Sequence, residues 1–146
     1  MVGDGVIGSS LIATQGIHHL GLTVSRLVES AAFFTKTLGW QEVRRVPEYP
    51  AIFVSDGTLM VTLWQASEAV SSHSFDHQHN VGLHHVAFRV ESRAALESVF
   101  IRVKASGARI EFAPEPLHEG PVIHMMCYEP SGIRVEFIWL PEQNVE

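Results

Sequence analysis

The sequence predicts an α+β fold built from two copies of one βαβββ module, and three observations support this. A His-His pair followed by alternating apolar residues occurs at 18–24 and again 66 residues later, at 84–90. A helix-like stretch follows each copy and ends at a glycine. The segments that end the two modules also match, 56–64 against 131–139. Repetition at a fixed spacing indicates one supersecondary unit used twice.

The first module begins with a strand at 17–24, where apolar residues alternate with small or polar ones. Ser25 is expected to cap the helix that follows, and Gly39 is expected to end it. Turn residues at Pro47, Pro50 and Asp56-Gly57 then separate short apolar runs. These runs predict three strands, at about 40–46, 51–55 and 58–64.

The second module repeats this order. A strand is expected at 84–90, followed by Ser92 as a helix cap and a helix over about 93–105 that ends at Gly107. The remaining apolar runs predict three strands, at about 108–112, 122–128 and 133–139.

The domain organisation follows from these elements. Each small sheet has one apolar face for its helix to cover, and pairing the two curved sheets through their other faces produces an open cup. We expect a flexible lead-in over 1–16, one domain over 17–140 and a tail over 141–146. Within the domain, the modules cover about 17–65 and 81–140, and a polar connector covers about 66–80.

Composition limits the possible partners. The chain has 146 residues, a net charge of −6 and no basic stripe, which disfavours nucleic acid. No apolar run approaches the roughly 20 residues of a membrane span, and the lead-in lacks the basic start of a signal peptide. Cys127 is the single cysteine, which fits a reducing compartment. We therefore expect a cytoplasmic protein with a small-molecule partner.

The alternation of side chains along the strands indicates a metal site. His19 and His85 point away from the apolar face of their strands, beside small or polar neighbours. In the last strand Val135 and Phe137 belong to the apolar face, so Glu136 points the other way. Two imidazoles and one carboxylate suit a divalent first-row metal and leave open positions for substrate and water. Open positions are typical of catalytic sites.

Residues 17–140 resemble the vicinal oxygen chelate superfamily, which includes glyoxalases, bleomycin-resistance proteins and extradiol dioxygenases. The last matching motif is similar to the family's Asp-Pro-x-Gly-x-x-x-Glu ending, with Glu129 in place of the aspartate. The resemblance implies the cup-shaped fold and a divalent metal, Fe(II), Mn(II), Zn(II) or Ni(II), held by the residues matching His19, His85 and Glu136. It also implies a homodimer with modules swapped between chains, although pairing within one chain stays open. The matching segments are Ile17–Val24, Leu38–Trp40, His84–Val90 and Glu129–Glu136.

The chain departs from particular members of this superfamily. Val61, or Thr62 if the register slips by one residue, stands where glyoxalase I carries a carboxylate and methylmalonyl-CoA epimerase a glutamine. Extradiol dioxygenases usually have a tyrosine at the place of Met126, for which Tyr128 could substitute, and an active-site histidine near His118. Tyr128 and His118 are therefore the catalytic candidates.

Two classes of function remain open. The first is a metal-dependent enzyme whose small substrate chelates the metal through adjacent oxygens, with dioxygenase, glyoxalase-like lyase or isomerase, or fosfomycin-type transferase chemistry. The alternative is a metal-free small-molecule or drug-binding protein. In either class, three further side chains with the inward orientation are candidates for substrate binding: His124, Arg89 and Arg134.

Overall fold

The computed structural model describes residues 11–67 and 73–141. Most of the expected lead-in and tail, residues 1–10 and 142–146, lies outside this range, as does part of the connector. The first module consists of β1 (His19–Val24), α2 (Leu27–Ala32), the π-helical turn η1 (Phe33–Thr37), β2 (Gln41–Val46), β3 (Ala51–Ser55) and β4 (Met60–Gln65). The second consists of β5 (Val86–Arg89), α3 (Arg93–Ser106), β6 (Arg109–Pro116), β7 (Ile123–Tyr128) and β8 (Arg134–Trp139).

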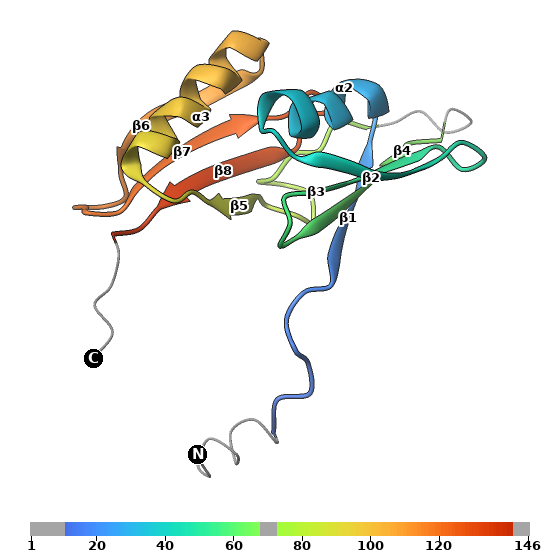
Figure 1. The fold of residues 1–146 in the computed structure, drawn as a ribbon, viewed down its shortest axis with the longest axis horizontal. Coiled ribbons are helices and arrows are strands. Elements are labelled where there is room, and N and C mark those ends of the chain that lie inside the picture. The colour runs from blue at the N-terminus through green and yellow to red at the C-terminus, as the bar shows by residue number, and fades with distance from the viewer. Residues whose placement is uncertain (1–10, 68–72, 142–146) are drawn as a thin grey trace.

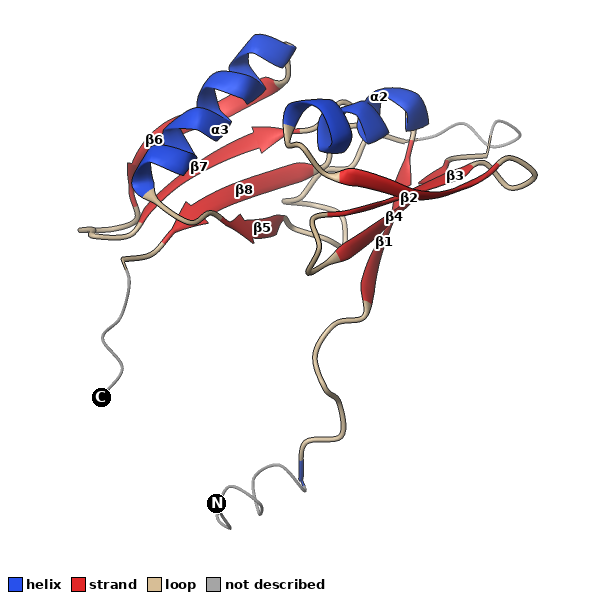
Figure 2. Ribbon diagram, in the orientation of Figure 1, coloured by secondary structure: helices blue, strands red, loops and turns tan. Residues whose placement is uncertain are grey.

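The two sheets have the same topology. The first has the strand order β1-β4-β3-β2 and the second β5-β8-β7-β6. In each, the first and last strands of the module pair in parallel, and the other pairs are antiparallel. The sheets lie next to each other, with the helices α2 and α3 on the same side (Figure 1). The predicted α+β fold of two βαβββ modules is therefore confirmed (Figure 2).

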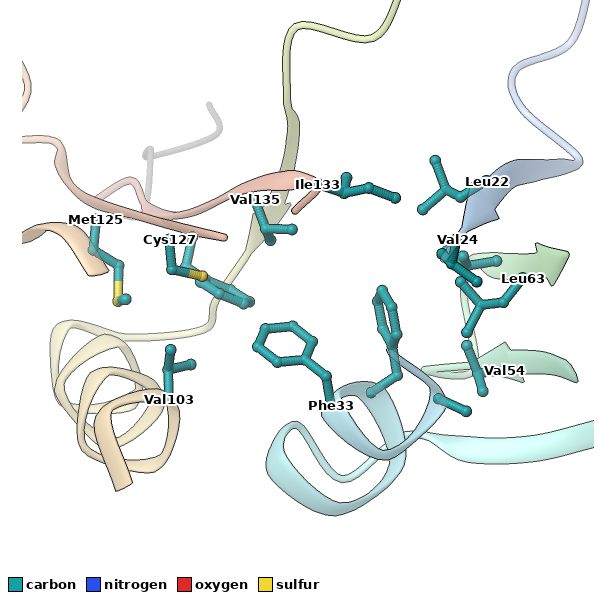
Figure 3. Close-up of a cluster of buried hydrophobic side chains, with 14 of the residues drawn as sticks. Leu22, Val24, Phe33, Val54, Leu63, Val103, Met125, Cys127, Ile133 and Val135 are labelled. Atoms are coloured by element: carbon teal, nitrogen blue, oxygen red, sulfur yellow. The ribbon is translucent and has the colours of Figure 1, made fainter. Parts of the chain in front are cut away.

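One hydrophobic core joins the modules. Figure 3 shows Phe33 of η1 between buried side chains of the first sheet and those of the second. The rings of Phe34 and Trp40, from the first module, lie 6.2 and 5.2 Å from the ring of Phe88 on β5. Because the helix layer packs against both sheets, the modules share apolar burial and stabilise each other.

The start of α2 differs from the prediction. Ser25 is not its cap: the N-cap residue is Arg26, whose own side chain makes no capping hydrogen bond. The free backbone N–H groups are satisfied from elsewhere, because the Arg26 N–H donates to Ser131 Oγ (3.0 Å) and the Leu27 N–H to Gln65 Oε1 (3.1 Å). Distant residues thus replace the local cap that the sequence indicated.

The start and end of α3 agree with the prediction. Ser92 Oγ accepts a hydrogen bond from the Ala95 N–H at 2.9 Å, and Gly107 ends the helix with a left-handed φ of 86°. Among the described residues, no helix is both long and apolar enough to cross a membrane.

The sheet faces opposite the helices, here called the open faces, are exposed along the edge strands β1 and β5 and buried at their centres, where Thr62, Met126 and Glu136 are 2–8% exposed. On β1, Leu22 and Val24 are buried in the core, whereas His19 and Gly21 are exposed. On β5, Arg89 is likewise exposed. The strand alternation that the sequence indicated is therefore confirmed, and the candidate site residues belong to the open faces.

Candidate metal centre

The two His-His pairs have the same geometry. Nδ1 of His18 lies 2.9 Å from Nδ1 of His19, and Nδ1 of His84 lies 2.8 Å from Nδ1 of His85. In each pair one nitrogen donates to the other. The Nδ1 atoms of His19 and His85 are therefore engaged, and Nε2 is the nitrogen that each has left for a metal.

Arg134 indicates which histidine of the second pair carries the proton. Its Nη1 lies 3.4 Å from His84 Nδ1, and a guanidinium can only donate. His84 Nδ1 is then the acceptor for both neighbours, so His85 Nδ1 holds the proton. The neutral form of His85 with its proton on Nδ1 has its lone pair on Nε2, as a metal ligand must.

Glu136 completes the second-module part of the site. Its carboxylate is 8% exposed; Oε1 lies 3.2 Å from His85 Nε2, and Oε2 accepts a hydrogen bond from His124 Nδ1 at 2.7 Å. The pairing of Ala87 with Glu136 positions the carboxylate beside the strand that His85 precedes. The two atoms are close enough to bind one cation between them, and a protonated His85 would form an ion pair with Glu136 across the same distance. The donors thus fit a divalent metal.

His19 is separate from this pair. Within residues 11–67 and 73–141, no group of three or more His, Cys, Asp or Glu side chains is close enough to hold a metal ion. His19 opens β1 of the first module, whereas His85 and Glu136 belong to the second. The structure therefore brings together two of the three expected ligands in one chain and leaves the third on the other open face.

The structural register decides between Val61 and Thr62. Thr62 pairs with Gly21 on β1 as Glu136 pairs with Ala87 on β5, so Thr62 is the first-module counterpart of Glu136. Val61 is fully buried in the core. The Thr62 hydroxyl is also buried and accepts a hydrogen bond from Trp64 Nε1 at 2.9 Å. A neutral hydroxyl group with a partner of its own therefore occupies the place of the glyoxalase carboxylate.

Tyr128 and Arg134 are both held by Glu111, a residue that the sequence analysis missed. The Tyr128 hydroxyl donates to Glu111 Oε1 at 2.7 Å, and Arg134 donates from Nε and Nη2 to the two carboxylate oxygens at 2.9 and 3.0 Å. The bonds from Arg134, more than the one from Tyr128, lower the pKa of Glu111 to about 2. Burial, together with the bond to Glu111, raises the pKa of Tyr128. The Arg134 charge is thus neutralised, and the Tyr128 hydroxyl keeps its proton.

The remaining candidate residues lie on β5, on β7 and in the connection between β6 and β7. Arg89 on β5 and His124 on β7 both pair with Ile138, one on each side of β8. Met126 pairs directly with Glu136. His118 is exposed in the connection between β6 and β7, with a positive φ of 58°. His124 therefore contacts the predicted ligand set, whereas His118 lies at the end of a hairpin.

The open face of the first module is aromatic. The Trp64 ring lies 5.6 Å from the ring of Phe53 and 5.2 Å from that of Tyr49. The Arg44 guanidinium lies 5.9 Å from the Phe53 ring centroid. This surface has the character of a wall for a flat or apolar ligand, in contrast to the polar face of the second module.

Comparison with known proteins identifies the family. The model of the Glyoxalase/Bleomycin resistance protein/Dioxygenase superfamily matches residues 16–137. The chain belongs to this superfamily. Members of the superfamily bind small molecules, usually use divalent metals and often form dimers. The superfamily's name covers several chemistries, so membership alone leaves the reaction open.

Individual relatives agree with the assignment to the superfamily. The uncharacterized protein YqjT of Bacillus subtilis (strain 168) is 28% identical over 127 residues, which cover 84% of this chain and 97% of that protein. A glyoxylase/bleomycin resistance protein/dioxygenase domain from Frankia sp. EAN1pec superposes with a TM-score of 0.77 at 24% identity, covering 90% and 96% of the two chains. Lactoylglutathione lyase from Agrobacterium tumefaciens gives a TM-score of 0.65 at 20% identity, covering 87% and 95%. At these identities the two solved structures show a common fold and no more.

Proposed function

We propose that this protein is a divalent-metal-dependent enzyme that acts on a small substrate through two adjacent oxygen atoms. The observation that supports this best is the arrangement of His85 Nε2 and Glu136 Oε1, which face each other at 3.2 Å on an open sheet face. The His84–His85 bond engages His85 Nδ1, so Nε2 is the ring nitrogen that faces Glu136 and can bind a metal. A divalent cation, when bound, would stabilise negative charge that develops on the substrate oxygens.

The complete site is proposed to form between two copies of the chain. His19 of one copy would join His85 and Glu136 of the other, since the described part of a single chain does not gather the three. On both polar sheet faces the residues of the edge strands β1 and β5 are exposed in the single chain, and a second copy would cover them. The aromatic face with Trp64 would then lie opposite the metal ligands and form the substrate wall.

The residues around the site favour some chemistries over others. Thr62 carries a hydroxyl, which is a poor base near neutral pH, so a proton shuttle between two carboxylates is disfavoured. Tyr128 donates its single O–H to an ionised Glu111 and has a raised pKa, so it would not serve as a base. Catechol-like or 2-hydroxy-keto substrates fit this site better than the methylglyoxal-glutathione hemithioacetal.

Metal analysis of protein purified without an affinity tag, followed by titration with Fe(II), Mn(II), Zn(II) and Ni(II), tests the proposal. We expect one metal per chain, and we expect His85→Ala to abolish tight binding. His73→Ala, which removes an exposed connector histidine, is the matched control and should bind as the wild type does. Unchanged metal affinity of His85→Ala would show that the ligand assignment is wrong.

Ligand titration of the metal-loaded protein tests the substrate class. Tighter binding of a catechol or 2-hydroxy-keto ligand than of the hemithioacetal is expected. Tight hemithioacetal binding with rapid isomerisation, and indifference to catechols, would favour glyoxalase chemistry instead.

A metal-free binding protein is the second candidate, and the aromatic face favours it. The Tyr49–Trp64–Phe53 cluster could hold a flat drug-like molecule by stacking and apolar contact alone. In that case an aromatic ligand should bind equally well to chelator-treated and metal-loaded protein, and His85→Ala should leave its affinity unchanged.

A further inference from the structure

We propose that His124 is a positioning residue that fixes which oxygen of Glu136 is presented to the metal. This inference rests on the proposed metal-dependent function. His124 Nδ1 lies 2.7 Å from Glu136 Oε2, and because an ionised carboxylate can only accept, the imidazole nitrogen donates. The opposite oxygen, Oε1, is the one beside His85 Nε2 at 3.2 Å. The two oxygens of Glu136 therefore have separate roles.

The backbone keeps this arrangement in place. His124 lies on β7 and Glu136 on β8, and the two strands pair along their whole length without a bulge, from Ile123–Trp139 to Tyr128–Arg134. Met126 is the direct partner of Glu136, so His124 lies two residues further along the same face of β7. Diagonal neighbours on adjacent strands remain within reach of long side chains.

Packing limits the movement of both side chains. The His124 side chain is 12% exposed and that of Glu136 10% exposed. The Phe112 ring on β6 lies 4.8 Å from the His124 ring at an angle of 58°, so the imidazole is held between an aromatic ring and the carboxylate. A hydrogen bond in such an enclosed place restricts rotation of the carboxylate more than a bond in water does.

The hydrogen bond from His124 would decide how many oxygens of Glu136 are free to bind a cation. With Oε2 held by His124, Glu136 has Oε1 as the oxygen that would hold a cation beside His85. Without this donor, Oε2 would lose its partner in a nearly buried place and would be free to turn toward the cation as a second ligand oxygen. Partners of this kind typically alter metal affinity by about 10- to 100-fold.

The test compares His124→Asn with His124→Leu. The two replacements have nearly the same shape, but only asparagine carries an N–H donor at about the position of Nδ1. Mn(II) affinity is measured by calorimetry, and the Co(II)-loaded protein is examined by visible absorption, which responds to the number of coordinating atoms. Met126→Leu, a volume-conserving change at the residue paired with Glu136, controls for disturbed packing on β7.

We expect His124→Leu to bind Mn(II) about 10- to 100-fold more weakly than wild type and to change the Co(II) spectrum. His124→Asn should recover most of the affinity and the wild-type spectrum, and Met126→Leu should keep both. Wild-type affinity and spectrum in His124→Leu would overturn the inference alone. Absence of metal binding by the wild-type protein would overturn the proposed function and the inference with it.

The positioning role of His124 can still be tested if the His124→Leu variant does not fold. If circular dichroism shows that His124→Leu is unfolded, His124→Gln replaces it, since its amide lies one bond further from Cβ and cannot take the same place. Equal Mn(II) affinity and equal Co(II) spectra of the glutamine and asparagine variants would then contradict the positioning role, and weaker binding of the glutamine variant would support it.

Discussion

Replacing Ser131 with alanine tests how the second module supports the first helix. The Ser131 hydroxyl accepts the Arg26 N–H at 3.0 Å and shares a hydrogen bond with the Ser30 hydroxyl at 2.6 Å. It thus supplies a helix cap from 105 residues away along the chain. Its removal costs the cap, about 1 kcal/mol, and one hydrogen bond of the fully buried Ser30 hydroxyl, about 1 kcal/mol more, while Ser30 keeps its bond to Glu129.

The sum, about 2 kcal/mol, corresponds to a fall in Tm of roughly 4–8 °C for a chain of this size. Differential scanning calorimetry at one protein concentration measures it, since Tm depends on concentration if the chain associates. Ser92→Ala is the matched control, because it removes a single local cap at 2.9 Å and should cost about 1 kcal/mol.

The double variant Ser30→Ala/Ser131→Ala separates the two contributions. It also removes the hydrogen bond between Ser30 and the buried carboxylate of Glu129, so it should be less stable than Ser131→Ala alone. A cost of Ser131→Ala no larger than that of Ser92→Ala would refute the cap from the second module, and a double variant as stable as Ser131→Ala would refute the role of Ser30.

Three further results are expected. Arg134 lowers the pKa of Glu111 to about 2, so this carboxylate contributes stability that is fully present above its unfolded pKa of about 4.5 and is lost as pH falls toward 2. The Tm of Glu111→Gln should therefore fall less than that of the wild type between pH 5 and pH 3. Equal falls in Tm would contradict the role of the Arg134–Glu111 pair. Thr62→Glu, which adds a carboxylate at the counterpart of Glu136, should strengthen Zn(II) binding in calorimetry, whereas unchanged affinity would place Thr62 away from the metal. Burial raises the pKa of Cys127 to about 12, so iodoacetamide at about pH 8 should label it only after denaturation, and fast labelling of the folded protein would show that this part of the core opens readily.

The fold could be predicted from the sequence because its two modules carry the same local signals. Alternation of apolar residues defined β1 and β8, and the Ser92 cap and Gly107 stop defined α3. The strand pattern also gave the correct face for His85 and Glu136. These features depend on residues close together in the chain, where periodicity and capping rules apply.

Features that depend on register or on distant partners were missed. The start of α2 is completed by Ser131 and Gln65, which no local pattern connects to it. Glu111 was missed because β6 pairs with β7 through register shifts between Ile110 and Glu115, so simple alternation does not give its neighbours. A strict alignment of the module ends pointed to Val61, one residue from the true counterpart.

The most direct test of the proposed site combines a His19→Ala chain and a His85→Ala chain in one dimer. Each variant by itself should lose tight metal binding. If His19 of one copy joins His85 and Glu136 of the other, a mixed dimer of the two variants contains one doubly altered site and one intact site. Co-expressed with different tags and purified through both, the mixed dimer should therefore bind one Mn(II) per two chains with wild-type affinity. Pairing within one chain would leave an alteration in every site, so a mixed dimer that binds no metal, beside a wild type that does, would contradict the account.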